Sequence, residues 1–235
     1  FDTTRITPYY QFIARNPTLF ELPMVPPKVS IVQRWEQWDY RPRRNFDGMS
    51  QILADSGYQY EVLFGAEDTN RMIPKPQYAL EENSLSQYSV LIVPKLEHCW
   101  ECGESGVGLM ITEDHASKLI NYATNGGLLI VVAEPDEVDT ALFANTGPRS
   151  TELLGYLNSA ETILGTGSVI HLPQLIGSLY QKTNDALSAA QIRNQLIDVL
   201  STKGITSAVN YGSNPRAVSS FLYTSSDHAV LHLVN

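Results

Sequence analysis

The stretch TEDHASKLINYATNGGLLIVVA, residues 112–133, decides the fold class. Its first half has the signals of a helix: Thr112 caps the first turn, two acidic residues follow at the positive end, and Asn125 with two glycines ends it. The segment from Leu128 to Ala133 is apolar throughout, which is typical of a strand covered on both faces. A helix followed by such a strand indicates a parallel sheet.

The same alternation of helix and strand continues on both sides of this stretch. Gly57 closes an upstream helix, and a downstream helix has apolar residues at helical spacing. These patterns predict an α/β fold with a flavodoxin-like, doubly wound, mostly parallel sheet and helices on both faces. The predicted strands are residues 28–33, 58–64, 88–94, 128–133 and 168–172, and the predicted helices are residues 46–56, 112–125 and 187–200.

The two ends of the chain follow other patterns. Thr7 and Pro8 predict a helix that runs to about Arg15 and gives way to a linker rich in proline. Near the other end, residues 217–224 and 228–234 predict an antiparallel hairpin, a short C-terminal β segment. The predicted organisation is a helix and linker from a preceding domain (1–27), a flavodoxin-like domain (28–212) and the start of a C-terminal β domain (213–235).

Composition narrows the class of protein. The chain has 235 residues, enough for a sizeable core, and its 43% hydrophobic content argues against disorder. A net charge of -9 argues against a nucleic-acid partner. The apolar stretches are too short to cross a bilayer and no basic-then-apolar leader opens the chain, so we expect a soluble protein, cytoplasmic or secreted. The start at Phe1 and the strand-like end suggest a piece of something longer.

Three segments carry a resemblance to a known family. They are YYQFIARNPTLFE (residues 9–21), YSVLIVPKLEHC with the later LINYATNGGLLIV (from residue 88), and the terminal AVLHLVN. In content and order they resemble the family 42 β-galactosidases and related modular glycoside hydrolases, in which a flavodoxin-like trimerisation domain follows a catalytic barrel. The sequence departs from that pattern in a longer loop over residues 97–110.

The resemblance implies a function for the chain. It would be a non-catalytic accessory and oligomerisation domain, with the catalytic barrel in the same polypeptide, a homo-oligomeric parent enzyme and a carbohydrate as the parent's substrate. It implies no cofactor. The family's acid and nucleophile lie in the barrel, so no catalytic residue is carried over to this chain, although Glu61, Glu97, Glu134 and Asp136 stand at strand ends.

The most distinctive cluster is RWEQWDY, directly after the first predicted strand. In a doubly wound sheet this position is the carboxyl edge, where ligands usually bind. Aromatic rings beside charged groups suit a sugar, but the same residue types are enriched in protein interfaces, and we favour the interface. Both hold if the loop overhangs a sugar site in a neighbouring domain. The candidate residues are Arg34, Trp35, Trp38, Asp39 and Tyr40.

A second loop offers an alternative function. Such flavodoxin-like domains resemble class I glutamine amidotransferases, so the chain could instead be a free-standing amidotransferase-like or sugar-handling hydrolase that uses the loop of His98 and Cys99. No nucleophile elbow surrounds Cys99, since the next helix starts only near Thr112, and His115 and His171 have no marked context as bases. His98, Cys99, Glu101 and Cys102 form only half of a zinc pattern, so a disulfide or free thiols are the simpler interpretation.

Overall fold

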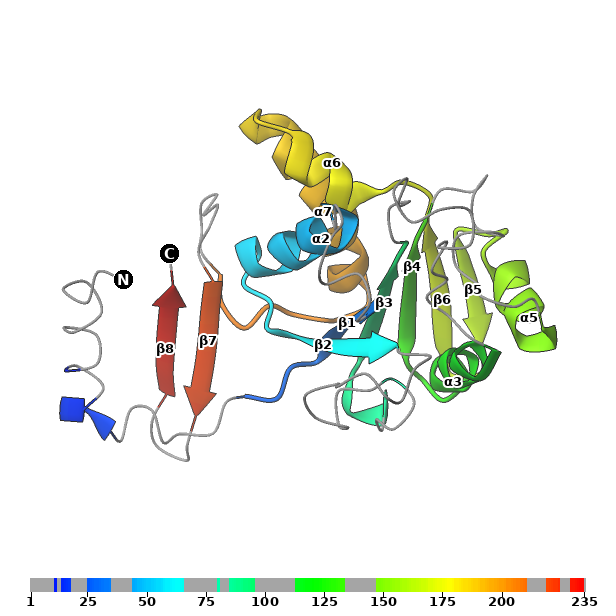
Figure 1. Cartoon of the computed structure of the whole chain (residues 1–235), viewed down its shortest axis with the longest axis horizontal. Coiled ribbons are helices and arrows are strands. Elements are labelled where there is room, and N and C mark those ends of the chain that lie inside the picture. The colour runs from blue at the N-terminus through cyan, green and yellow to red at the C-terminus, as the bar shows by residue number, and fades with distance from the viewer. Residues whose placement is uncertain are drawn as a thin grey trace.

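The computed structural model describes residues 11, 14–17, 25–34, 44–65, 80, 85–95, 113–133, 147–210, 219–224 and 229–234. Within these ranges the chain forms two sheets and the helices that cover the larger one (Figure 1). The strands are β1 (Val29–Arg34), β2 (Tyr60–Gly65), β3 (Val90–Pro94), β4 (Leu128–Val132), β5 (Glu161–Leu164), β6 (Gly167–Leu172), β7 (Ser219–Thr224) and β8 (Ala229–Val234). The helices are α2 (Arg44–Asp55), a 3-10 turn η4 (Leu85–Gln87), α3 (Glu113–Thr124), α5 (Pro148–Tyr156), α6 (Ile176–Lys182) and α7 (Ala186–Thr202).

The larger sheet has six strands in the order β2-β1-β3-β4-β6-β5. All neighbouring pairs are parallel except β5 with β6, so β5 is an antiparallel strand at one edge. Without β5, the strands follow the 2-1-3-4-5 order of flavodoxin-like doubly wound sheets. The structure confirms the predicted α/β fold class.

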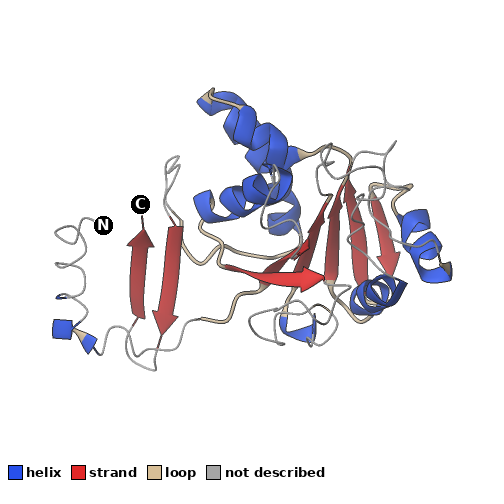
Figure 2. Cartoon of the chain, viewed as in Figure 1, coloured by secondary structure: helices blue, strands red, loops and turns tan. Residues whose placement is uncertain are grey.

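Helices lie on both faces of this sheet (Figure 2). Alternate strand residues face opposite ways, and two separate hydrophobic clusters result. Ile31, Ile92 and Ile130 belong to the cluster under α2, α6 and α7, whereas Leu91 and Leu129 belong to the cluster under α3 and α5. Strands β3 and β4 are buried at every position, as the run of apolar residues predicts.

Helices α2 and α6 cross with almost no space between their backbones. An added Cβ on Gly48 of α2 would lie 1.9 Å from the carbonyl oxygen of Gly177, and one on Gly177 of α6 would lie 2.0 Å from that of Asn45. The Tyr180 hydroxyl donates a 2.6 Å hydrogen bond to the buried carboxylate of Asp55 across the same pair of helices. The two glycines therefore set how closely α6 approaches α2.

The predicted hairpin is present as β7 and β8, which pair antiparallel apart from the larger sheet (Figure 1). The linker reaches it, since the Val25 amide donates a 2.9 Å hydrogen bond to the carbonyl of Leu222 in β7. The short C-terminal β segment is thus confirmed. The domain boundaries at residues 27 and 212 stay predictions.

Among the described residues, the structure adds four elements that the sequence patterns do not predict: η4, α5, β5 and α6. The predicted helix over residues 7–15 lies mostly outside the described residues, of which Gln11, Ala14 and Arg15 are helical. The other predicted boundaries agree within two residues, for example the helix predicted from Phe46 that begins at Arg44. No described helix has the length and apolar character needed to span a membrane.

Candidate functional site

The carboxyl edge of the sheet is the candidate site, because open α/β sheets usually bind ligands there, at the point where the strand order reverses. That point lies between β1 and β3. From β1 the chain crosses to β2 on one side, and from β2 it returns to β3 on the other side of β1. Helix α2, after β1, covers one face, and α3, after β3, belongs to the other. β1 ends at Arg34, the first residue of the RWEQWDY cluster, so this first residue lies at the carboxyl edge.

Most of the predicted site residues lie outside the described part of the chain. Only the backbone of Arg34 is described, as the last residue of β1, and the positions of Trp35, Trp38, Asp39 and Tyr40 are not. The candidate metal and thiol loop with His98, Cys99, Glu101 and Cys102 is outside it too, as are Glu97, Glu134 and Asp136. The role of the RWEQWDY cluster as a sugar site or an interface stays a prediction.

Asn45 is a structural amide at this edge that the sequence reasoning missed. Its side chain is buried; Nδ2 donates to the Lys95 carbonyl at 2.9 Å, and Oδ1 accepts from the Gly177 amide at 3.2 Å. It therefore ties the first turn of α2 to the end of β3 and the first turn of α6. Its place beside Phe46, at the start of an amphipathic helix, is a weak signal for such a role.

Gln33 is the unusual residue of the edge. It is fully buried, and neither Oε1 nor Nε2 of its side chain has a hydrogen-bond partner among the residues that the structure describes. In β1 it follows Ile31 on the face under α2 and α6. An unpaired buried amide costs about 1–3 kcal/mol, so natural sequences seldom keep one without a reason. The only sequence signal is a polar residue near the end of an apolar strand.

We expect Gln33→Met to raise the free energy of unfolding of the 235-residue chain by about 1 kcal/mol, because methionine has a similar shape and no polar group to desolvate. Asn45→Leu is the matched variant, since it removes a buried amide that has both of its partners, and it should lower the same quantity by about 2 kcal/mol. Urea unfolding measures both. A loss of stability in Gln33→Met equal to that in Asn45→Leu would contradict the unpaired amide.

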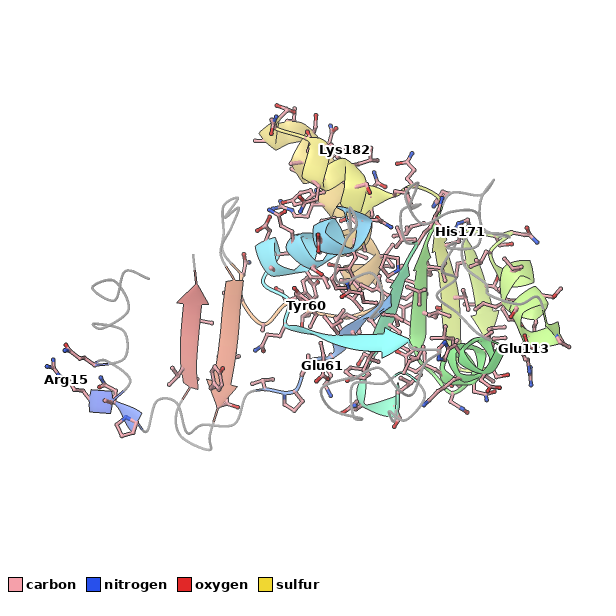
Figure 3. All side chains as sticks on the ribbon, viewed as in Figure 1. Arg15, Tyr60, Glu61, Glu113, His171 and Lys182 are labelled. Carbon is pink, nitrogen blue, oxygen red and sulfur yellow. The ribbon has the colours of Figure 1, made fainter. Side chains whose placement is uncertain are left out.

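The two histidines that were considered as bases have structural positions. His171, near the carboxyl end of β6 (Figure 3), is buried, with Nδ1 2.7 Å from the Leu157 carbonyl oxygen and Nε2 2.8 Å from that of Ala133. A neutral imidazole donates from one ring nitrogen and both neighbours are acceptors, so the ring donates to one carbonyl and lies against the other, between the end of α5 and the end of β4. His115 is buried in α3.

Glu61, the one described residue among the four acids named at strand ends, also has a structural contact. It lies on the edge strand β2 (Figure 3), and its carboxylate accepts a hydrogen bond from the Tyr88 hydroxyl. Across the described residues, no group of three or more His, Cys, Asp or Glu side chains could hold a metal ion.

No family model and no curated protein sequence matches this sequence. Its structure is similar to those of solved β-galactosidases. For the enzyme from Bacillus circulans sp. alkalophilus the TM-score is 0.56 at 12% identity over 93% of this chain, and for that from Rahnella sp. R3 it is 0.54 at 13% over 90%. For a catalytic mutant of Gan42B, a GH42 β-galactosidase from G. stearothermophilus, it is 0.54 at 12% over 88%.

The match covers 36%, 36% and 34% of those three chains, respectively. The chain therefore spans about a third of the length of these β-galactosidases. At such low identity the likeness shows a shared fold.

Proposed function

We propose that the chain is a non-catalytic accessory domain of a β-galactosidase-like glycoside hydrolase, and that it contributes to the oligomeric assembly of the parent enzyme. The observation that carries the proposal is the coverage: 93% of this chain matches only 36% of the B. circulans enzyme. A domain of a larger enzyme has this relation to the whole. The catalytic barrel of the same polypeptide would then bind and cleave the carbohydrate.

Three acids among the described residues have structural contacts, which supports a non-catalytic role. Glu61 accepts from Tyr88, and Asp55 accepts from Tyr180 between two helices. Glu113 accepts three hydrogen bonds at the start of α5. A retaining glycosidase needs two carboxylates about 5–5.5 Å apart on either side of the scissile bond. These carboxylates instead hold elements of the fold together.

The RWEQWDY segment, which begins with the last residue of β1, supports an assembly role. This RWEQWDY segment combines tryptophan, tyrosine and arginine, the residue types that dominate interface energetics. It begins where β1 ends, at the carboxyl edge of the sheet, where the loops that follow the parallel strands lie. We propose that this segment contacts the barrel or a second subunit, and that it shapes the sugar site if it overhangs the barrel.

The purified chain should hydrolyse aryl galactosides and aryl glucosides no faster than a buffer control. The same assay tests the alternative of a free-standing hydrolase that uses the Cys99 loop. Turnover that Cys99→Ser abolishes without a change in melting temperature would support that alternative, and turnover that an acid-to-amide variant such as Glu61→Gln abolishes would place a glycosidase site in this chain. Either result would contradict the proposed function.

A further inference from the structure

A cavity of about 760 Å³ lies at the opposite, amino edge of the sheet. Its wall contains the residues just before β3 and the first residues of β4 and β6. These strand starts lie side by side, because Val90 pairs with Leu128 and Leu128 pairs with Ser168. The C-terminal turns of α3 and the residues after α7 complete it. Its size is within the range of small-molecule sites, about 300–1,000 Å³.

Backbone packing fixes the wall of this cavity. An added Cβ on Gly127 would lie 2.2 Å from the ring of Tyr122, and one on Gly167 would lie 2.2 Å from the carbonyl oxygen of Ala123. The Gly127 amide closes the end of α3 through a 3.0 Å hydrogen bond to the Tyr122 carbonyl, and its own carbonyl accepts from Ser168 at 3.2 Å. A wall held in this way is preorganised, which reduces the entropic cost of binding a ligand.

The phenol of Tyr122 forms part of the same wall. It donates a 3.3 Å hydrogen bond to the carbonyl of Tyr88, and burial raises its pKa, so it stays a neutral donor at physiological pH. Both tyrosine rings are buried, with exposures of 3% for Tyr88 and 7% for Tyr122. They therefore offer no open aromatic face on which a neutral sugar could stack.

The charge of the lining is opposite to that of the protein. The whole chain carries -9, yet the charged residues that line the cavity are two lysines, Lys118 of α3 and Lys203 after α7. Lys203 forms an ion pair with Glu161, and both side chains are partly exposed, at 31% and 38%. Such exposed pairs contribute little to stability, so Lys203 can turn to another anion at small cost.

The remaining polar groups of the lining are neutral. The exposed ones are the hydroxyls of Ser86 and Thr166 and the side-chain amides of Asn121 and Asn125, and the hydroxyls of Ser89 and Ser168 lie deeper in the wall. Hydroxyls and amides donate and accept hydrogen bonds, as a polyhydroxy ligand requires.

We propose that this cavity binds a small polyhydroxy anion, with its phosphate or carboxylate between Lys118 and Lys203 and its hydroxyls on the asparagine and threonine side chains. The anionic group is common to sugar phosphates and sugar acids. The site is separate from the carboxyl edge, and it requires no assumption about the parent enzyme.

Calorimetry and thermal melting of the 235-residue chain at low salt test the proposal, with glucose 6-phosphate, gluconate and glucose as probes. We expect at least one of the two anions to bind and to raise the melting temperature, and glucose to do neither. Binding of glucose 6-phosphate alone assigns the site to phosphates, and binding of gluconate alone assigns it to carboxylates. Binding of neither anion, or of glucose as tightly as the anions, would overturn the proposal.

Two matched pairs of variants locate the binding. Lys118→Met should weaken it about tenfold or more, whereas Lys182→Met, at the far end of α6 (Figure 3), should leave it unchanged. Asn125→Asp keeps both lysines and adds a negative charge to the lining, so it should also weaken binding, with Asn194→Asp on α7 as its control. If Lys118→Met fails to fold, the second pair decides. Equal affinities within the pair that decides would overturn the proposal.

Discussion

Gly48→Ala should lower the free energy of unfolding by about 3 kcal/mol or more. The new methyl group would lie 1.9 Å from the Gly177 carbonyl oxygen and 2.4 Å from its carbon, and both are backbone atoms that no rotamer change can move. Helix α6 would have to shift off α2. That shift would break the hydrogen bond between the Gly177 amide and Asn45, and it would loosen the packing around Met49.

Gly155→Ala is the matched control for this effect. Gly155 lies in the last turn of α5, and an added Cβ there meets nothing within 4 Å. Glycine in a helix interior costs about 0.5–1 kcal/mol relative to alanine, so in the last turn this variant should be more stable by up to that amount. Urea unfolding measures both changes. The close crossing of the helices would be contradicted if Gly48→Ala had the same free energy of unfolding as the unchanged chain, or if both variants lowered it equally.

The parallel part of the sheet could be predicted from the sequence because its signals are local. Residues 128–133 are apolar throughout, and the glycines at 126 and 127 mark the end of the preceding helix. Gly126 has φ of 105°, which favours glycine at that position, and Gly127 has no room for a side chain beside Tyr122. Strands that are buried on both faces are typically apolar at every position, and the same signal therefore predicts both β3 and β4.

Helix α5 could not be predicted in this way because its N-terminal cap comes from a distant part of the chain. Its own N-cap residue, Gly147, has no side chain to offer. The carboxylate of Glu113 takes this place, with hydrogen bonds of 2.6 Å and 3.0 Å from the amides of Arg149 and Ser150. Burial acts to raise the pKa of Glu113, but these hydrogen bonds and that from the Ser150 hydroxyl outweigh it, and the pKa is lowered. No local pattern around residue 148 contains this contact.

The candidate site could be predicted only in outline. Arg34 lies at the carboxyl edge because β1 ends there. The sequence predicts this position because an apolar strand is followed directly by an aromatic cluster. The roles of the buried amides could not be predicted, because the partners of Asn45 are backbone groups that only the fold brings to it, whereas Gln33 has no partner among the described residues. The amino-edge cavity could not be predicted either, because Lys118 and Lys203 are 85 positions apart in the sequence (203 minus 118) and only the folded chain brings them to one cavity.

Substituting Trp35 and Trp38 together by alanine in the parent enzyme should weaken its assembly about thirtyfold or more. A buried aromatic hot spot contributes about 2 kcal/mol or more to association, and that free energy corresponds to this factor. If the segment also overhangs the sugar site, the Michaelis constant rises as well. Sedimentation over a concentration series and steady-state kinetics measure the two effects.

The same double substitution in the 235-residue chain is the control for that experiment. A surface cluster should leave the melting temperature of the chain nearly unchanged, because no core packing is lost. A large fall in melting temperature, with unchanged assembly and kinetics of the parent, would instead assign the two tryptophans to the core of the domain.

Deleting residues 28–212 from the parent enzyme tests the assembly role most directly, with sedimentation equilibrium as the measurement. The proposed assembly role predicts that the parent sediments as an oligomer and that the deletion variant sediments at the mass of one subunit. Circular dichroism of the deletion variant checks that its barrel is still folded. A deletion variant that keeps the full number of subunits would contradict the account.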